Sequence, residues 1–413
     1  MRAKALAALL LAAAVPARAT AVSWEDVAGL AAAGNPALSS SRLTRDARRL
    51  SYYSSYNRLL PSLSLSNSVS QSNASRDNAW SASASASLTL FDLGEYASIR
   101  SASASLASSE ASLRRASADL RSSLRRSFSA LLLAQTGLEV ARRVLALRRN
   151  NAELVGLRYE SGRESKGNRL RAQAQLLQAQ VGLATAEREL RTSQRELGRQ
   201  LGREGFEAFI ATGTFTAGTP PARPDDFTAL LTLRPEIAAA EASLRSAEAS
   251  LASARSAYFP NLSANYSRTR NGGTEFPSSR YGWSAGATLS LPLFGGGPAS
   301  TVLASLSAKR EREAARHDLI SARQTGLSDL ESAWASFADA DAQVGVQDAL
   351  LAAARQRNEE ADVRYASGLL SFDNWELIVS DRVGTERQAV SARRAAMDAE
   401  TAWDRSLGRA LGE

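Results

Sequence analysis

The stretch "WSASASASLTL", residues 80–90, alternates without a break between apolar and hydroxyl side chains. Because successive side chains of a β-strand point to opposite faces, the stretch places Trp80, the alanines and the leucines on one face and the serines on the other. The same alternation recurs in three further segments of similar length. It predicts four strands, at about 62–72, 80–91, 261–271 and 281–293.

The polar face of these segments is nearly all Ser, Thr and Gly, with few charges. A half-buried sheet in a soluble protein also alternates, so the pattern alone leaves two interpretations open. The uncharged polar face favours a water-filled lumen, and the strand lengths fit tilted transmembrane strands. Aromatic residues at the strand ends, Trp80, Tyr281 and Trp283, fit the aromatic girdle at a membrane interface. We therefore favour membrane strands over a soluble sheet.

Four strands are too few to close a membrane barrel, and an open sheet edge is not tolerated in lipid. Closed membrane barrels begin at about eight strands. Several copies of the chain must then share one barrel. Eight strands make a barrel filled by side chains, whereas a larger number leaves a channel. The serine-rich face favours the channel, which predicts a homotrimer with a shared 12-stranded β-barrel in outer-membrane lipid.

The rest of the chain has helical periodicity and is rich in alanine, which suits closely packed helices. The two longest patterns would each rise roughly 98 Å if about 65 residues long. The shorter helices of each half together match the long one, so we expect them to stack end to end along it. A solvent-exposed coiled coil is the alternative. The expected helices are at about 24–58, 95–160, 164–202, 225–258, 299–366 and 373–411.

Several short phrases occur twice, in the same order, which predicts an internal duplication. The clearest pair is "RYESG" at 158–162 and "RYASG" at 364–368. The further pairs are "NPAL" (35–38) with "RPEI" (234–237), "LLPSLSLS" (59–66) with "YFPNLSAN" (258–265), "LFDLG" (90–94) with "LFGGG" (293–297), and "RELGRQLG" (195–202) with "RSLGRALG" (405–412). We expect repeats at 20–202 and 225–413. Residues 203–224 form a Gly-, Thr- and Pro-rich linker with a short strand at "FIATGTF".

Residues 1–19 have the pattern of a secretory signal, with a basic start, an apolar run and "ARA" as the cleavage site. The 413-residue chain has no cysteine, which excludes disulfides, thiolate metal sites and a lipid anchor on a new N-terminus. The net charge is +8, but charges of both signs are spread along the helices, so we expect no nucleic-acid partner.

Nothing in the sequence indicates catalysis. The motifs of metalloproteases, serine hydrolases and nucleotide-binding enzymes are absent, and the single histidine, His317, lies in a polar helical stretch. We therefore expect no enzyme activity, no cofactor and no metal.

Taken together, the paired motifs and the strand pattern resemble the outer-membrane efflux proteins of the TolC type over nearly the whole mature length. The resemblance implies a trimeric channel-tunnel, with a β-barrel above a long α-helical barrel, that acts as a passive exit duct. It also implies two partners, a periplasmic adaptor (membrane fusion) protein and an inner-membrane RND or ABC transporter. An outer-membrane duct for type I protein secretion shares this architecture, and a secreted coiled-coil adhesin is a third interpretation.

In that family the Tyr-x-x-Gly turns are periplasmic tips that dock on the adaptor and form the closed entrance. The resemblance implies tip turns at 158–168 and 364–374 here. The alternative is a plain helix C-cap, in which glycine supplies a positive φ. For Arg158 and Arg364 we expect first a favourable charge at the helix C-terminus. The expected contact residues are Arg158, Tyr159, Gly162, Arg163, Arg364, Tyr365, Gly368 and Leu369.

At the entrance the chain departs from the family pattern. The family often carries two aspartates after the second turn, where this chain has Asn374 and Leu377, and Asn168 takes the corresponding place in the first half. An acidic ring would then have to come from the neighbouring Asp373 and Glu376. A constriction by Asn374, Leu370 or Leu377 is the alternative.

Overall fold

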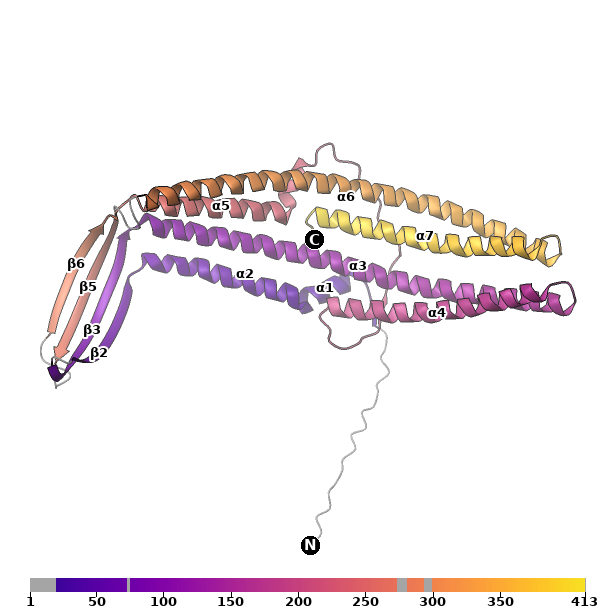
Figure 1. Ribbon diagram of the computed structural model, residues 1–413, viewed down its shortest axis with the longest axis horizontal. Helices are drawn as coiled ribbons and strands as arrows, with labels where there is room; N and C mark the ends of the chain where they lie inside the picture. Colours follow the sequence, from indigo (N-terminus) through magenta and orange to yellow (C-terminus); the bar gives the residue numbers. More distant parts are fainter. Residues whose placement is uncertain (1–19, 73–74, 273–280, 293–298, 413) are drawn as a thin grey trace, which may run out of the picture.

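The computed structural model describes residues 20–72, 75–272, 281–292 and 299–412. The expected signal segment 1–19 and the "LFGGG" phrase at 293–297 lie outside the described residues. Two helices dominate the molecule, α3 (Leu93–Glu160) and α6 (Ser300–Ala366). At 68 and 67 residues, each rises roughly 100 Å. They run alongside each other and give the molecule its elongated shape (Figure 1).

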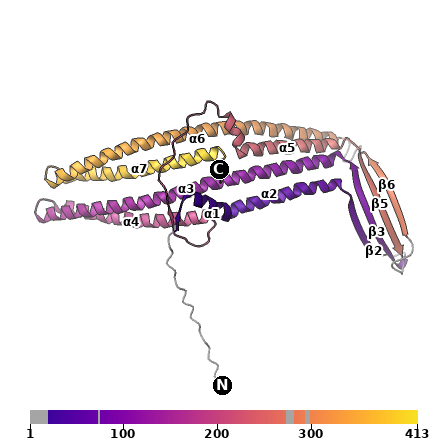
Figure 2. The same ribbon diagram turned by 180° about the vertical axis from the view of Figure 1, so that it is seen from behind.

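Shorter helices lie in series along the two long ones. In Figures 1 and 2, α2 (Pro36–Ser55) and α4 (Lys166–Gln200) follow one another along α3, and α5 (Pro235–Ser256) and α7 (Phe372–Ser406) follow one another along α6. The two halves therefore have the same layout. None of the helices in the described part of the chain carries an apolar stretch long enough to cross a membrane.

The segment expected as one helix over 24–58 is broken at a proline. Helix α1 (Trp24–Gly34) ends before Asn35, and α2 begins at Pro36. A residue before proline is pushed out of the helical region, and Asn35 accordingly has an extended backbone with φ −72° and ψ 120°. Its side chain then caps α2 by accepting a hydrogen bond from the Leu38 amide at 3.0 Å. The α2 helix is followed by a 3₁₀ turn, η1 (Tyr56–Leu59).

The second half breaks at the same place for the same reason. The expected helix over 225–258 is a 3₁₀ turn, η2 (Thr228–Leu233), followed by α5 from Pro235. Arg234 precedes the proline with φ −76° and ψ 124°. Instead of capping the helix, its side chain reaches α6 and donates hydrogen bonds to the Gly326 carbonyl at 2.7 Å and to Asp329 at 2.9 Å.

These breaks are where the serial helices meet. The Asn35 side-chain amide donates to the Gln200 carbonyl at 2.8 Å, joining the start of α2 to the end of α4. Gly202 follows with φ +75°, and a Cβ there would lie 2.2 Å from the Gly34 carbonyl oxygen. In the other half a Cβ on Gly408, at φ +73°, would lie 2.6 Å from Pro235 Cδ. The duplicated Pro and Leu-Gly motifs are therefore the two sides of one junction.

This geometry corrects one detail of the repeat alignment. Gly202 and Gly408 both come directly after the C-cap leucine of a helix. Their amides donate equivalent hydrogen bonds, Gly202 N to Arg199 O at 3.1 Å and Gly408 N to Arg405 O at 3.0 Å. The equivalent phrases are thus "RQLG" at 199–202 and "RSLG" at 405–408, rather than the longer phrases paired from sequence.

The hydrophobic core is thickest beside these junctions. In the first half, Leu124, Phe128 and Leu131 of α3 pack against α1, the end of α4 and β4 (Phe209–Ala211). The second half has its own cluster around Leu330, Phe337 and Trp403. β4 pairs with β1 (Thr20–Val22) in a two-stranded parallel sheet, so the linker carries the short strand expected there.

The remaining strands form one antiparallel sheet in the order β2-β3-β5-β6, at the end of the molecule opposite the two helical turns (Figure 1). The two hairpins, one from each repeat, join where β3 pairs with β5. Strand β3 begins earlier than the expected residue 80, at Ser75. The strand bounds are β2 Ser62–Ser72, β3 Ser75–Phe91, β5 Asn261–Gly272 and β6 Tyr281–Ser290.

Candidate functional site

The two RYxSG phrases end α3 and α6, and their turns lie close together at the end of the molecule farthest from the four-stranded sheet (Figure 1). Gly162 has φ +72° and Gly368 has φ +82°. In each turn the glycine amide and the next amide bond back into the helix, for example Gly368 N to Tyr365 O at 3.0 Å and Leu369 N to Arg364 O at 2.8 Å. This is the Schellman arrangement, which needs a residue that tolerates a positive φ.

Both glycines are exposed on an open surface. A Cβ at Gly162 would meet nothing within 4 Å, and one at Gly368 would meet only the Arg158 guanidinium, at 3.8 Å. The cap explains why the backbone needs glycine. The cap does not require the space beside each glycine to be open. This open space leaves the turns accessible to another molecule.

Arg158 joins the two helical hairpins, α3 with α4 and α6 with α7, at this end of the molecule. Its Nη1 donates to the Tyr365 carbonyl at the end of α6, and its guanidinium carbon lies 4.5 Å from the Tyr365 ring centroid. The positive charge of Arg158 was expected to stabilise the C-terminus of its own helix, α3. It instead lies at the C-terminus of α6. Arg364, the equivalent residue of the second turn, is exposed.

The two tyrosines of the motif are not equivalent. Tyr365 is 1% exposed, and its ring stacks on the Trp375 ring with 4.2 Å between the two ring centroids. Its hydroxyl donates a hydrogen bond to Glu164 at 3.0 Å. Trp375 in turn donates from Nε1 to Asp362 at 2.7 Å. Tyr159 is half-buried, with the Arg169 guanidinium 5.0 Å from its ring centroid. Only the second tyrosine is therefore built into the contact between hairpins.

Titration of Glu164 and Tyr365 is linked to this contact. Burial raises the pKa of Glu164, but hydrogen bonds from Asn168, the Ser165 amide and Tyr365 outweigh it, and the pKa lies below its usual value. Burial, and then the Glu164 carboxylate, raise the pKa of Tyr365. Both shifts favour the pair of a charged carboxylate and a neutral phenol.

We predict that the tip loosens in acid. Because the pKa of Glu164 is depressed in the folded tip, its contribution to stability is present above the unfolded pKa of about 4.5 and is lost as the pH falls through the folded value. Hydrogen-exchange protection of the amides in the two turns should therefore fall below about pH 4.5. The Glu164→Gln variant should lack this step. An identical acid response in both proteins would contradict the prediction.

The entrance candidates fall into two groups. Glu376 is 2% exposed and pairs with Arg148 of α3, whose Nη1 lies 2.8 Å from both carboxylate oxygens. Ser380 donates a further hydrogen bond to Glu376 at 2.7 Å. This corrects the expectation that Glu376 could supply negative charge to an open pore, because its charge is satisfied between two helices of one chain.

The other candidates remain near the surface of the chain. Asp373 is exposed and pairs with Arg171 of α4 at 3.1 Å. Asn374 and Leu377 are exposed on α7, while Leu370 packs partly buried against the cluster of Tyr365, Phe372 and Trp375. In the first turn, Asn168 donates to Glu164 at 2.7 Å.

Sequence reasoning missed three residues that organise the tip: Arg148, Glu164 and Trp375. A signal for Arg148 was present, because it lies on the same helical stripe as the buried Val144 and Val155. A charge on an apolar stripe requires a partner. The partner itself, more than two hundred residues away, has no such signal.

A groove of about 380 Å³ runs between the two turns. It is lined from α3 by Leu154, Leu157 and Arg158 and from the turns by Ser161, Arg163, Ala366, Ser367 and Gly368. Next to it Leu369 is 80% exposed, and Leu157 is 60% exposed. The tip thus combines exposed leucines with arginines at a site formed by both halves. Within the described ranges, no cluster of His, Cys, Asp and Glu could hold a metal ion.

A four-stranded sheet with open edges, set on a helical body about 100 Å long with paired turns at its far end, defines a subunit of a channel-tunnel. The chain belongs to the outer membrane efflux protein family, whose model matches residues 27–203 and 228–409. The two matched segments correspond to the two structural repeats, and the gap between them overlaps the linker.

Solved channels have the same fold. CusC superposes with a TM-score of 0.83 at 19% identity, covering 92% of this chain and 91% of that one. The open state of MtrE from Neisseria gonorrhoeae gives 0.81 at 22% identity, covering 94% and 89%. VceC from Vibrio cholerae gives 0.80 at 17% identity, covering 93% and 96%. No curated protein sequence matches the chain. The mainly helical fold, the two repeats and the class of outer-membrane efflux channel are thereby confirmed.

Proposed function

We propose that the protein is the passive exit duct of a tripartite efflux pump in a Gram-negative bacterium, after removal of its signal peptide. Three copies would each contribute their four-stranded sheet to one 12-stranded barrel in the outer membrane. The helices would extend into the periplasm as a hollow bundle. Channels of this family are homotrimers that work with adaptors and inner-membrane transporters.

The observation that carries the proposal is the groove at the helical tips. It lies at the end of the molecule away from the sheet, where a partner from the inner membrane would arrive. Exposed leucines beside arginines suit an amphipathic helical hairpin that offers apolar residues flanked by carboxylates. We expect the adaptor to dock there, and an RND or ABC transporter to load the duct without any catalytic step in this chain.

The proposal is tested with the purified mature protein and a cell assay. Unboiled outer-membrane extracts should contain a heat-labile trimer, and the trimer should conduct ions in planar bilayers, with higher conductance when the cognate adaptor is added. In a host lacking its own duct, co-expression with the adaptor and transporter should restore resistance to small toxic compounds. A monomeric, water-soluble mature protein would overturn the proposal, and rescue of protein secretion alone would assign the duct to type I export.

A further inference from the structure

The four-stranded sheet has two chemically opposite faces. On one face serines pair across strands, with 2.7 Å between the hydroxyls of Ser64 and Ser85 and of Ser66 and Ser83. The other face is apolar and exposed. Leu65 is 80% exposed, and Trp283 and Leu289 are each 69% exposed. In the proposed barrel the serine face lines the lumen and the apolar face contacts lipid.

Two arginines break the apolar face. The register places Arg268 opposite Ala84 on β3 and Trp283 on β6, and Arg270 opposite Ala82 and Tyr281. Directly paired residues of adjacent strands share a face, so both arginines lie with the alanines and aromatics rather than with the serines. The Arg268 guanidinium carbon lies 5.5 Å from the Tyr281 ring centroid.

The position of these arginines along the barrel axis matches the interface between the apolar band and water. From Asn261 to Arg270 the strand advances roughly 30 Å, which at a tilt of about 40° is roughly 23 Å along the barrel axis. The apolar band of such barrels is about 25 Å tall and is bounded by aromatic residues. Tyr281 and Trp283 lie at this level. A charge on the lipid side costs little there, because a long side chain can extend to the interface.

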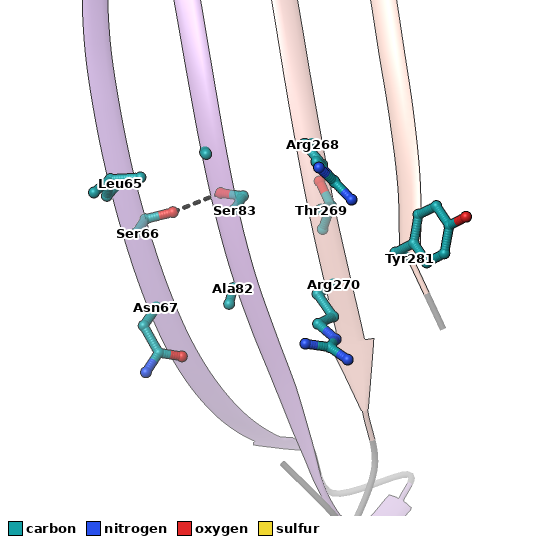
Figure 3. Close-up of a pocket in the computed structure, with 10 residues that line it drawn as sticks. Leu65, Ser66, Asn67, Ala82, Ser83, Arg268, Thr269, Arg270 and Tyr281 are labelled. Carbon is teal, nitrogen blue, oxygen red and sulfur yellow. Dashed lines mark hydrogen bonds between the residues drawn. The ribbon is translucent and has the colours of Figure 1, made fainter. Parts of the chain in front are cut away.

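A hollow lies over this part of the sheet. It measures about 760 Å³, and its lining includes Leu65, Asn67, Ala82, Ala84, both arginines and Tyr281. Figure 3 shows Arg268 and Arg270 on β5, with Tyr281 on the neighbouring strand and Leu65 and Asn67 across the sheet. Small alanines and Ser83 form the middle of the hollow, Leu65 and the polar Asn67 lie on one side, and the two arginines lie on the other.

We propose that this hollow binds the head group of a phosphorylated lipid in the leaflet farthest from the helices. The inference rests on the proposed membrane orientation. The planar guanidinium groups of Arg268 and Arg270 match phosphate oxygens in bidentate geometry, and a lipid-facing site strengthens such charge-assisted bonds. The first carbons of an acyl chain then cover Leu65 and the alanines. A free phosphate would use the arginines but leave the apolar part of the hollow empty.

The test uses the intact trimer in detergent and measures lipid binding by native mass spectrometry. The probes are bisphosphorylated lipid A, its dephosphorylated form and inorganic phosphate. Wild-type trimer should bind the phosphorylated lipid at least about tenfold more tightly than either other probe. The Arg268→Gln/Arg270→Gln variant should lose that preference. A matched variant, Arg245→Gln/Arg255→Gln, removes two exposed arginines from α5 and should keep it.

Equal binding of lipid A by the sheet variant and the wild type would overturn the inference, as would equally tight binding of inorganic phosphate. Should the glutamine variant fail to form trimers, Arg268→Lys/Arg270→Lys keeps the charge without the bidentate geometry and should show an intermediate preference. An unchanged preference in the lysine variant would also count against the site. Conductance separates the two proposals, because loss of lipid preference with a normal channel leaves the duct intact.

Discussion

The Glu376→Ala variant is expected to lose about 3–5 kcal/mol of stability where α3 meets α7, because it leaves the Arg148 guanidinium buried without its counter-charge. The side chains of Arg148 and Glu376 are only 10% and 3% exposed, so water cannot replace the lost partner. The free energy of local opening should fall by that amount, as measured by hydrogen exchange of the α7 amides over 372–383. Conductance of the channel should rise with it.

Two controls separate the buried pair from surface charge. The Asp373→Ala variant removes an acid only three residues away whose partner, Arg171, is exposed, and it should cost less than about 1 kcal/mol. The double variant Arg148→Met/Glu376→Leu replaces the pair with apolar groups of similar size and should recover most of the loss. Equal effects of the two acid-to-alanine changes would show that Glu376 does not hold the hairpins together.

The second large effect is expected at the tip glycines. Replacing both Gly162 and Gly368 by asparagine should abolish efflux in the complementation assay while the trimer remains at its normal level. Asparagine tolerates a positive φ, so the Schellman turns persist. No neighbouring atom within 4 Å obstructs a new Cβ at Gly162. What changes is the open surface of the turn, which the added amides occupy.

This design distinguishes a contact surface from a plain helix cap. If the glycines serve only as caps, the asparagine variants should support efflux as well as the wild type does. Normal resistance would then exclude the turns as adaptor contacts. Asparagine at Gly205, which has an unobstructed Cβ position in the linker, serves as the matched control and should leave efflux unchanged. Trimer content is read from unboiled membrane extracts in every case.

Much of the architecture could be predicted because it follows from the local periodicity of apolar residues. The strict alternation over 80–90 determines which side chains share a face of a strand, and the longer period determines the buried stripe of α3. Leu124, Phe128 and Leu131 of that stripe are buried. The helix breaks at Pro36 and Pro235 could also have been predicted, since proline excludes helical backbone in the residue before it.

The sequence by itself determined the two-faced strands, the long helices and the glycine turns, because each depends on residues close together in the chain. It also determined the duplication, because the same short phrases recur in the same order. Only the tertiary structure decided that Tyr365 is buried while Tyr159 is not, that Arg158 binds the end of α6, and that Glu376 is neutralised by Arg148. These contacts join residues about two hundred positions apart. The physical reason is that two repeats with the same layout but different sequences pack against each other, so the same local motif acquires different partners in each half.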